Sequence, residues 1–276
     1  MIRKAGVDDV RFCHELTAIE DWNYTAEEIR AMVTNEDTDF YIAEKKGEKR
    51  GMAAAFRYGD SAWIGLVIVS REYRGQGVGT ALVEEVLKKV KSQGVTTVRL
   101  ESVPEAVSLY ERLGFTPEFE SLRLRGTCRG KNKKSSPLSK DMLKDICEFD
   151  QKYFGVRRDK FLEKFFALSP IRLVDADTRV KGYLLVRSGF GFKAPCKIGP
   201  CVCEDVTSCE LLLKKALSQL KGPVSLGIPA PNTEGVDLLE RYGFTITGAS
   251  LRMVWGKKEY CGVPEKIFAI GGPEKG

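Results

Sequence analysis

The glycine-rich stretch at residues 74–80, Arg-Gly-Gln-Gly-Val-Gly-Thr, constrains the fold more than any other part of the chain. An apolar run precedes it at residues 64–69, as is typical of a strand buried on both faces. Apolar residues at helical spacing follow it, with charged residues between them. Residues 67–91 are therefore predicted to form a strand, a tight turn and a helix.

The alternating glycines of this turn favour phosphate binding. They let the backbone turn with its N–H groups pointing inward, and the following helix adds the positive end of its dipole. Arg74 places a full positive charge beside them. A turn of this kind before a helix is a typical site for phosphate oxygens.

Spacing separates three kinds of phosphate-binding loop. A P-loop needs a lysine after its glycines, and none follows here, so that interpretation fails. A dinucleotide fingerprint needs Gly-x-Gly-x-x-Gly. Thr80 occupies its third glycine position, although Glu101 has about the spacing of a ribose-binding acid. The pattern Arg/Gln-x-x-Gly-x-Gly/Ala fits residues 74–79 without a gap.

This third pattern is the acetyl-CoA pyrophosphate loop of the GNAT (Gcn5-related N-acetyltransferase) superfamily, and the chain resembles that family beyond the loop. Residues 70–77 resemble the family's exit from its fourth strand. Residues 109–115, Leu-Tyr-Glu-Arg-Leu-Gly-Phe, resemble its later Leu-Tyr-x-x-x-Gly-Phe element. The two motifs are separated by a helix and then by a strand predicted at residues 95–100, as in the family. The resemblance covers residues 1–125 strongly.

The resemblance implies where acetyl-CoA, the acyl donor, binds. The end of the central strand would pair with the pantetheine amides, and the loop would hold the pyrophosphate. Val103 stands where the family usually has an asparagine, so one pantetheine contact is expected to be missing. The implied contacts are Val67, Ile68, Val69, Arg74, Gly75, Gln76, Gly77, Val78, Gly79 and Thr80.

Two residues are candidates for proton transfer. By resemblance, Tyr110 points its hydroxyl at the coenzyme sulfur and acts as the general acid. Its ordinary pKa of about 10 keeps it protonated near neutral pH. Glu101 follows the predicted fifth strand, beside the split where the amine would enter, and is our first choice of general base. Asp21, Asp60 and Glu118 stay open as alternatives.

The loop between the first two predicted helices is the expected acceptor-binding element. In the family this loop covers the acceptor site, so Trp22 and Asn23 are expected to bind substrate, although Trp22 as a simple packing anchor stays open. Thr25 and Glu28 form a capping box, which predicts a helix over residues 26–33. Strands predicted from residue 39 to residue 69 form an antiparallel meander before the glycines, which favours this family over a doubly wound sheet.

The chain contains an internal repeat. Residues 111–116, Glu-Arg-Leu-Gly-Phe-Thr, recur as Glu-Arg-Tyr-Gly-Phe-Thr at residues 240–245. Ser-Leu-Arg at residues 121–123 recurs at 250–252 with the same offset. We expect a first domain at residues 1–125, a basic linker at 126–137 and a second, degenerate copy at 138–276.

The second copy lacks the phosphate loop. Between a strand ending at Cys203 and a helix predicted over residues 209–220 there is no glycine, and Glu204 and Asp205 stand where phosphates would lie. Negative charges there would repel a pyrophosphate. We expect this copy to complete the acceptor pocket or to cover the sheet of the first domain.

Composition limits the partners and the compartment. The formal net charge is +6, but the basic stretch near residue 131 has no interleaved aromatic residues, so a nucleic-acid partner is not expected. No apolar run is long enough for a membrane helix, and the start has no secretory signal. Eight cysteines without a signal indicate a reducing compartment, and we expect a cytoplasmic location. Cys196, Cys201, Cys203 and Cys209 cluster without metal-site spacing, so no metal is expected.

The sequence predicts an α/β protein with two tandem GNAT-like domains. Each is expected to have a mostly antiparallel sheet that is splayed at its central strands and flanked by helices. The expected function is direct transfer of the acetyl group of acetyl-CoA to a primary amine of a small molecule. The alternative is a non-catalytic acyl-CoA-binding regulatory module. A membrane partner is not expected, and the oligomeric state is open.

Overall fold

The computed structural model describes the chain except residues 21, 23, 132–138, 188–194 and 258–261, and it divides into two compact units. The first unit contains the residues up to Pro117, the end of strand β11 (Thr245–Gly256) from Met253 on, and Glu274–Gly276. The second unit contains Glu118–Arg252 and, after the undescribed stretch 258–261, residues 262–273. Both units are mixed, mostly antiparallel sheets with flanking helices, so the predicted fold class is confirmed.

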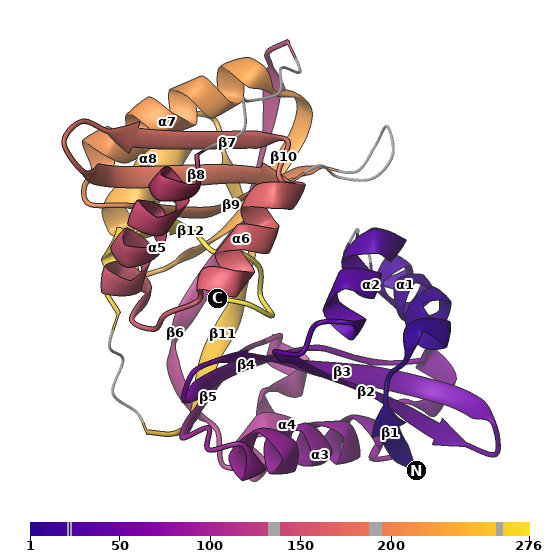
Figure 1. Cartoon of the computed structure of the whole chain (residues 1–276). Coiled ribbons are helices and arrows are strands. Elements are labelled where there is room, and N and C mark those ends of the chain that lie inside the picture. Colours follow the sequence, from indigo (N-terminus) through magenta and orange to yellow (C-terminus); the bar gives the residue numbers. More distant parts are fainter. Residues whose placement is uncertain (21, 23, 132–138, 188–194, 258–261) are drawn as a thin grey trace. The chain divides into compact units, whose positions relative to one another are not determined.

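The first unit is an antiparallel meander that ends in one parallel pairing. Its strand order is β1-β2-β3-β4-β5 with the end of β11 beside β5, and Figure 1 shows α1 and α2 on one side of the sheet and α3 and α4 on the other. This order excludes the doubly wound parallel sheet of the dinucleotide alternative. The elements are β1 (Ile2–Lys4), α1 (Val10–Ile19), α2 (Ala26–Val33), β2 (Thr38–Lys45), β3 (Glu48–Tyr58), β4 (Ser61–Val69), α3 (Val78–Ser92), β5 (Thr97–Ser102) and α4 (Val107–Arg112).

Strands β4 and β5 pair along only the first part of their length. Their parallel pairing runs from Ser61 opposite Thr97 to Ile64 opposite Leu100. At Leu66 the backbone takes a φ of 53°, which is uncommon for a residue other than glycine, and the register between β3 and β4 shifts there. The bulge turns the rest of β4 away from β5, so the sheet is splayed at this point.

Specific hydrogen bonds determine where α2 and β5 begin. The capping box before α2 is confirmed, because Thr25 Oγ1 accepts the Glu28 N–H at 3.0 Å and Glu28 Oε2 accepts the Thr25 N–H at 2.9 Å. Strand β5 begins at Thr97 rather than at residue 95. The Thr96 N–H bonds to Asp60 O at 2.8 Å, so it belongs to the turn before the strand.

The second unit repeats the architecture of the first. Its strand order is β6-β10-β9-β8-β7. Alternate residues of β8 point to opposite faces of this sheet and enter two cores. Leu184 and Val186 lie in the core beneath α7 and α8, and Tyr183 and Leu185 lie in the core beneath α5 and α6. The elements are β6 (Thr116–Arg129), α5 (Lys140–Phe154), α6 (Asp159–Leu168), β7 (Ile171–Ala176), β8 (Val180–Arg187), β9 (Cys196–Cys203), α7 (Val206–Gln219), β10 (Lys221–Pro229), α8 (Thr233–Arg241) and β12 (Ile267–Ala269).

Strand β12 fills the gap between β9 and β10. These two parallel strands pair only where Cys196 and Lys197 lie opposite Val224 and Ser225. Beyond that point Ile267 of β12 lies opposite Val202 of β9, and the Ile270 N–H donates to Gly227 O of β10 at 2.8 Å. The second unit therefore has the same split between central strands, and its own chain closes it.

The predicted linker begins inside a strand. Strand β6 continues to Arg129, and it pairs with β10 from Ser121 opposite Pro229 to Arg129 opposite Lys221. The first residues of the stretch expected as a linker, 126–129, are therefore part of the sheet, because β10 supplies backbone partners for them. Gly130 and Lys131 follow the strand, and their N–H groups donate to Leu220 O and Ser218 O at 2.6 and 3.2 Å. The rest of the predicted linker, residues 132–137, lies outside the described residues. Among the helices that the structure describes, none is both long and apolar enough to cross a membrane.

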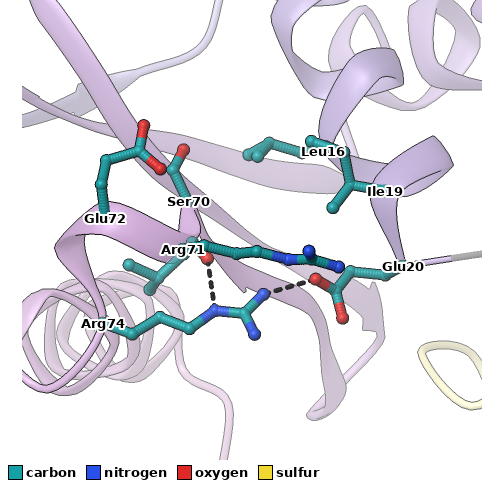
Figure 2. Close-up of a pocket in the computed structure, with 8 residues that line it drawn as sticks. Leu16, Ile19, Glu20, Ser70, Arg71, Glu72 and Arg74 are labelled. Carbon is teal, nitrogen blue, oxygen red and sulfur yellow. Dashed lines mark hydrogen bonds and ion pairs between the residues drawn. The ribbon is translucent and has the colours of Figure 1, made fainter.

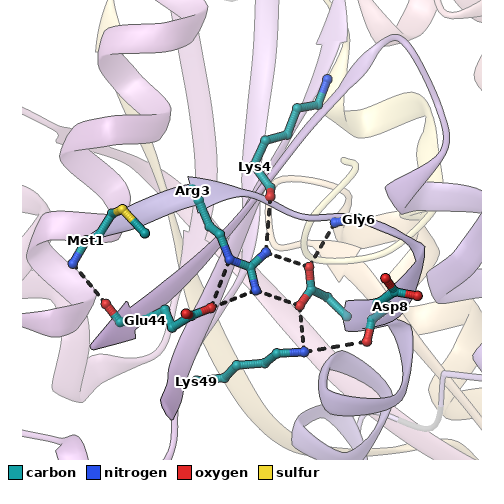
Figure 3. Close-up of polar contacts among 8 residues, drawn as sticks. Met1, Arg3, Lys4, Gly6, Asp8, Glu44 and Lys49 are labelled. Atoms are coloured by element: carbon teal, nitrogen blue, oxygen red, sulfur yellow. Dashed lines mark hydrogen bonds and ion pairs between the residues drawn. The ribbon is translucent and has the colours of Figure 1, made fainter. Parts of the chain in front are cut away.

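A charged cluster fastens β1 to the sheet of the first unit (Figure 3). Asp9 is 2% exposed, and its carboxylate accepts hydrogen bonds from both terminal nitrogens of Arg3 at 2.7 and 2.9 Å. Lys49 Nζ lies 2.7 Å from the same carboxylate, and the Gly6 N–H donates to it at 2.8 Å. The hydrogen bonds from Arg3 hold the pKa of Asp9 well below its usual range.

Replacing Asp9 with asparagine is expected to destabilise the protein by about 2 kcal/mol at pH 7, because several charge-assisted hydrogen bonds are lost. A carboxyl whose pKa is lowered on folding contributes stability above its unfolded pKa. The difference between wild type and Asp9→Asn should therefore shrink below about pH 4. Denaturant unfolding at several pH values measures this. The exposed partner of Arg11 gives a control, and Glu15→Gln should change nothing measurable. A pH-independent difference would contradict the prediction.

Candidate functional site

The glycine loop ends in a helix start that no side chain caps. Helix α3 begins at Val78, and its N-cap Gly77 has a φ of 77° in the left-handed region. Gly75 has a φ of 73°, and a Cβ at either glycine would meet nothing within 4 Å. Backbone conformation therefore favours glycine at both positions, and crowding does not. The first N–H groups of α3 lack partners within the helix, which leaves a cluster of donors beside an exposed loop.

Arg74 is held at the edge of this loop (Figure 2). Its Nε donates to Val69 O at 2.9 Å, and its guanidinium forms an ion pair with Glu20 at the end of α1. The Arg74 side chain is 48% exposed, against 28% for Glu20. The cation is thus positioned by β4 and remains accessible to an anion.

A cavity of about 240 Å³ lies beside Arg74. It is bounded by the end of α1, the end of β4 and the turn that leads to the glycines, and Figure 2 shows the Arg71 side chain extending across it toward Glu20. The cavity thus combines an apolar wall with two guanidinium groups. Its lining residues are Leu16, Ile19, Glu20, Val69, Ser70, Arg71, Glu72 and Arg74.

Helix α4 meets the loop from the other side. A Cβ on Gly79 would lie 3.6 Å from Val69 Cγ2 and 3.7 Å from Leu109 Cδ1, so the end of β4, the start of α3 and α4 converge there. Tyr110, next to Leu109, is buried, and its ring stands edge-on to Phe115 with centroids 5.8 Å apart. Burial raises the pKa of Tyr110 to about 12, which keeps its hydroxyl protonated at neutral pH.

Four of the other predicted site residues lie where β4 and β5 stop pairing. Val67, Ile68 and Val69 form the part of β4 beyond its pairing with β5. Glu101 lies inside β5, one residue past the last paired position, and not after the strand as expected. Trp22 is half-buried, and its backbone N–H donates to Thr17 O at 2.9 Å. Asn23 and Asp21 lie outside the described residues.

The structure adds residues that the sequence did not indicate. Glu20 and Arg71 flank Arg74, and Arg71 stands in the quoted strand-exit motif, so its position was a usable signal. Tyr24, two residues after Trp22 in the chain, is buried and contacts Glu274. Nothing in the sequence pattern connects residues so far apart.

In the second unit the equivalent helix start is closed. Helix α7 begins at Val206 rather than at residue 209, because Asp205 caps it and accepts the Ser208 N–H at 2.8 Å. Glu204 forms an ion pair with Arg179 at 2.5 Å. A carboxylate therefore occupies the place that phosphate oxygens would need.

Three of the clustered cysteines meet in the core of the second unit. The sulfur atoms of Cys201, Cys203 and Cys209 lie within 4.8 Å of one another, while Cys196 is outside this group. Burial raises the pKa of Cys203 and Cys209 well above the usual range, so in the absence of a metal ion these thiols are neutral. Each cysteine in the described part of the chain is free of disulfide bonds.

Comparison with known proteins gives the same family for both units. Residues 9–115 match the model of the acetyltransferase (GNAT) family, and residues 146–269 match a model of an acetyltransferase (GNAT) domain. The holothin acyltransferase of Pseudoalteromonas sp. (strain SANK 73390) is 24% identical over 99% of this chain and 94% of its own length. The uncharacterised N-acetyltransferase YitH of Bacillus subtilis is 24% identical over 80% of this chain and 79% of its own.

Solved structures agree on the fold. The structure of a proposed acetyltransferase from Pyrococcus horikoshii aligns with a TM-score of 0.83 at 23% identity, covering 100% of this chain and 95% of that one. A GCN5-related N-acetyltransferase from Sphaerobacter thermophilus aligns with a TM-score of 0.63 at 15% identity, covering 96% and 98%. Both likenesses extend over the two units.

The raised pKa of Tyr110 predicts a pH-dependent contribution to stability. A tyrosine whose pKa is higher in the folded state favours folding below its unfolded pKa of about 10 and loses this contribution as the pH rises. Relative to Tyr110→Phe, the wild type should lose about 1 kcal/mol of unfolding free energy between pH 8 and pH 11. Urea unfolding of both proteins at the two pH values measures this, and all other titrating groups are common to them. An unchanged difference would show that the Tyr110 pKa is ordinary.

Proposed function

Because the chain is a two-domain member of the GNAT superfamily of acetyltransferases, we propose that its first unit moves the acetyl group of acetyl-CoA directly to a primary amine of a small molecule. One observation carries the proposal. The start of α3 has no side-chain cap, and Gly75 and Gly77 before it have left-handed conformations. It lies beside Arg74 at the end of β4, where β4 no longer pairs with β5.

The residues at this site fit the chemistry of the donor. The N–H groups of the loop and the guanidinium of Arg74 suit the pyrophosphate oxygens. Beyond Ile64 the backbone of β4 still pairs with β3 but no longer with β5. The proposed contact of the pantetheine amides is therefore the edge of Val67, Ile68 and Val69 that faces away from β3. Holding the donor in this way supplies much of a rate enhancement through positioning alone.

The transfer needs one proton removed and one supplied. The amine nitrogen attacks the thioester carbon, a C–N bond forms, the C–S bond breaks, and the coenzyme leaves as a thiol once its sulfur is protonated. Tyr110 holds a proton at neutral pH and is the proposed donor to that sulfur. Glu101, on the splayed part of β5, is the proposed acceptor of the amine proton.

Two observations support a small acceptor and a single donor site. The relative that aligns with 99% of this chain is named holothin acyltransferase, which supports an acceptor of the small-molecule class. In the second unit, β12 fills the gap between central strands and Asp205 caps α7. We therefore assign coenzyme binding to the first unit alone.

Gly77→Val is expected to weaken acetyl-CoA binding at least about tenfold, because the left-handed N-cap that presents the loop N–H groups is disturbed. Gly47, in the turn between β2 and β3, is a matched control, since its φ is 79° and a Cβ there also meets nothing within 4 Å. Gly47→Val should carry similar strain but keep its affinity. Isothermal titration of each protein with acetyl-CoA decides this. Equal affinities in the two variants would contradict the proposed donor site.

Tyr110→Phe separates an enzyme from a module that only binds acyl-CoA. If Tyr110 protonates the leaving sulfur, turnover with an amine acceptor should fall about 10²- to 10⁴-fold, while acetyl-CoA affinity stays within about twofold. Release of the free coenzyme thiol and calorimetric titration provide the two readings. A variant with wild-type turnover would remove Tyr110 from the proposed mechanism.

A further inference from the structure

The segment Glu274–Gly276 packs within the first unit against β4. A Cβ on Gly65 would lie only 2.0 Å from Glu274 Cβ and 2.5 Å from Glu274 Cα, so only a glycine allows the segment to come this close. Gly65 directly follows Ile64, the last residue of β4 that pairs with β5. The segment therefore lies where the two central strands begin to diverge.

Lys275 presents a primary ammonium group inside this unit. The residue is 3% exposed, and its ammonium donates to the carboxylate of Glu274, which is 1% exposed. The Tyr24 hydroxyl donates to the same carboxylate oxygen, and Lys275 Nζ lies 3.4 Å from that hydroxyl. The nitrogen lies 4.9 Å from the centre of the Tyr24 ring and 5.3 Å from that of Phe56. We call Tyr24, Phe56 and Glu274 the ammonium cage.

Stability alone does not account for this arrangement. A buried ion pair is often no better than apolar residues of the same volume, because both charges must lose their water. Covering β4 at Gly65 would therefore need neither Glu274 nor Lys275. A carboxylate combined with aromatic faces is, in contrast, the chemistry that selects a primary ammonium ion.

We propose that the ammonium cage binds the ammonium group of the acceptor, and that Lys275 fills it as an internal substitute until an acceptor displaces it. The inference rests on the proposed function and names the recognition element of that same site. Tyr24 comes from the loop after α1 that also carries Trp22, and Phe56 and Gly65 come from β3 and β4, which lead to the donor loop. The class of ligand is a primary amine that binds in its charged form and loses one proton to solvent before its nitrogen attacks the thioester.

Competition within the chain sets the apparent affinity for the acceptor. Lys275 is covalently attached, so its effective concentration at the cage is high. An acceptor binds only in the fraction of molecules whose cage is open, which weakens its apparent affinity by that fraction. Removing the ammonium of Lys275 should therefore improve amine binding, although it removes a contact from the resting protein.

The test uses the full chain with Lys275→Met, which keeps an apolar stem and removes the charge. The probe is n-butylamine, which carries a lysine-like stem, and 1-butanol is its neutral counterpart. Isothermal titration at pH 7.5 should show n-butylamine binding to Lys275→Met at least about tenfold more tightly than to the wild type. The affinity for 1-butanol should not differ between the two proteins. Equal affinity of n-butylamine for both, or 1-butanol binding as well as the amine, would overturn the proposal.

A second variant covers the case in which Lys275→Met folds poorly. That variant leaves the Glu274 carboxylate buried without its ammonium, so n-butylamine and not 1-butanol should raise its melting temperature. In Glu274→Gln/Lys275→Met both charges are removed together, and this protein should fold but bind n-butylamine at least about tenfold more weakly than Lys275→Met does. A poorly folded Lys275→Met that n-butylamine does not stabilise would also overturn the proposal.

These measurements contain no acetyl-CoA, so the two proposals can fail separately. If acetyl-CoA does not bind while n-butylamine binds the Lys275→Met protein as expected, the proposed function falls and the cage stands as an amine site. If acetyl-CoA binds and the amine result is negative, the acetyltransferase proposal stands without this recognition element.

Discussion

The divergence of β4 from β5 is the constraint on which the rest of the first unit depends. Parallel strands normally satisfy each other's backbone groups along their length. Here pairing ends at Ile64 and Leu100, and the bulge at Leu66 re-aims the remainder of β4. The end of β4 leads into the glycine turn, and its Val69 O accepts a hydrogen bond from Arg74. The starts of α3 and of α4 pack against this strand end near Gly79. A ladder of full length would leave no gap between these two strands.

The two units share a gap between their central parallel strands but differ in what satisfies its backbone groups. Each contains a parallel pair of central strands that opens after a few residues, and an open gap exposes backbone donors and acceptors that require partners. In the second unit β12 supplies them, and Asp205 satisfies the helix start that would otherwise attract an anion. In the first unit the corresponding helix start has no side-chain cap. In the second unit the covering strand and the capped helix start thus occur together.

Sequence reasoning predicted what local chemistry determines. The capping box at Thr25 and Glu28, the meander, the glycine loop and the second copy of the fold follow from short-range patterns, and the structure has them. Contacts between distant segments could not be found in this way. The pairing of Arg74 with Glu20 and of Tyr24 with Glu274 depends on tertiary packing, and neither pair carries a periodic or spacing signal. The extension of β6 to Arg129 was missed for the same reason, since β10 lies far along the chain.

Strand β11 has a consequence for how the two copies depend on each other. Its first part belongs to the second unit, whereas Met253 and the residues after it belong to the first, where the Lys257 N–H bonds to Thr96 O at 3.2 Å. Without that strand end, the edge of β5 would present unpaired backbone groups and invite aggregation. A chain cut after the first copy would therefore be an incomplete fold. Neither copy of the repeat supplies all the strands of its own unit, because the first unit takes the end of β11 and the second takes most of β6.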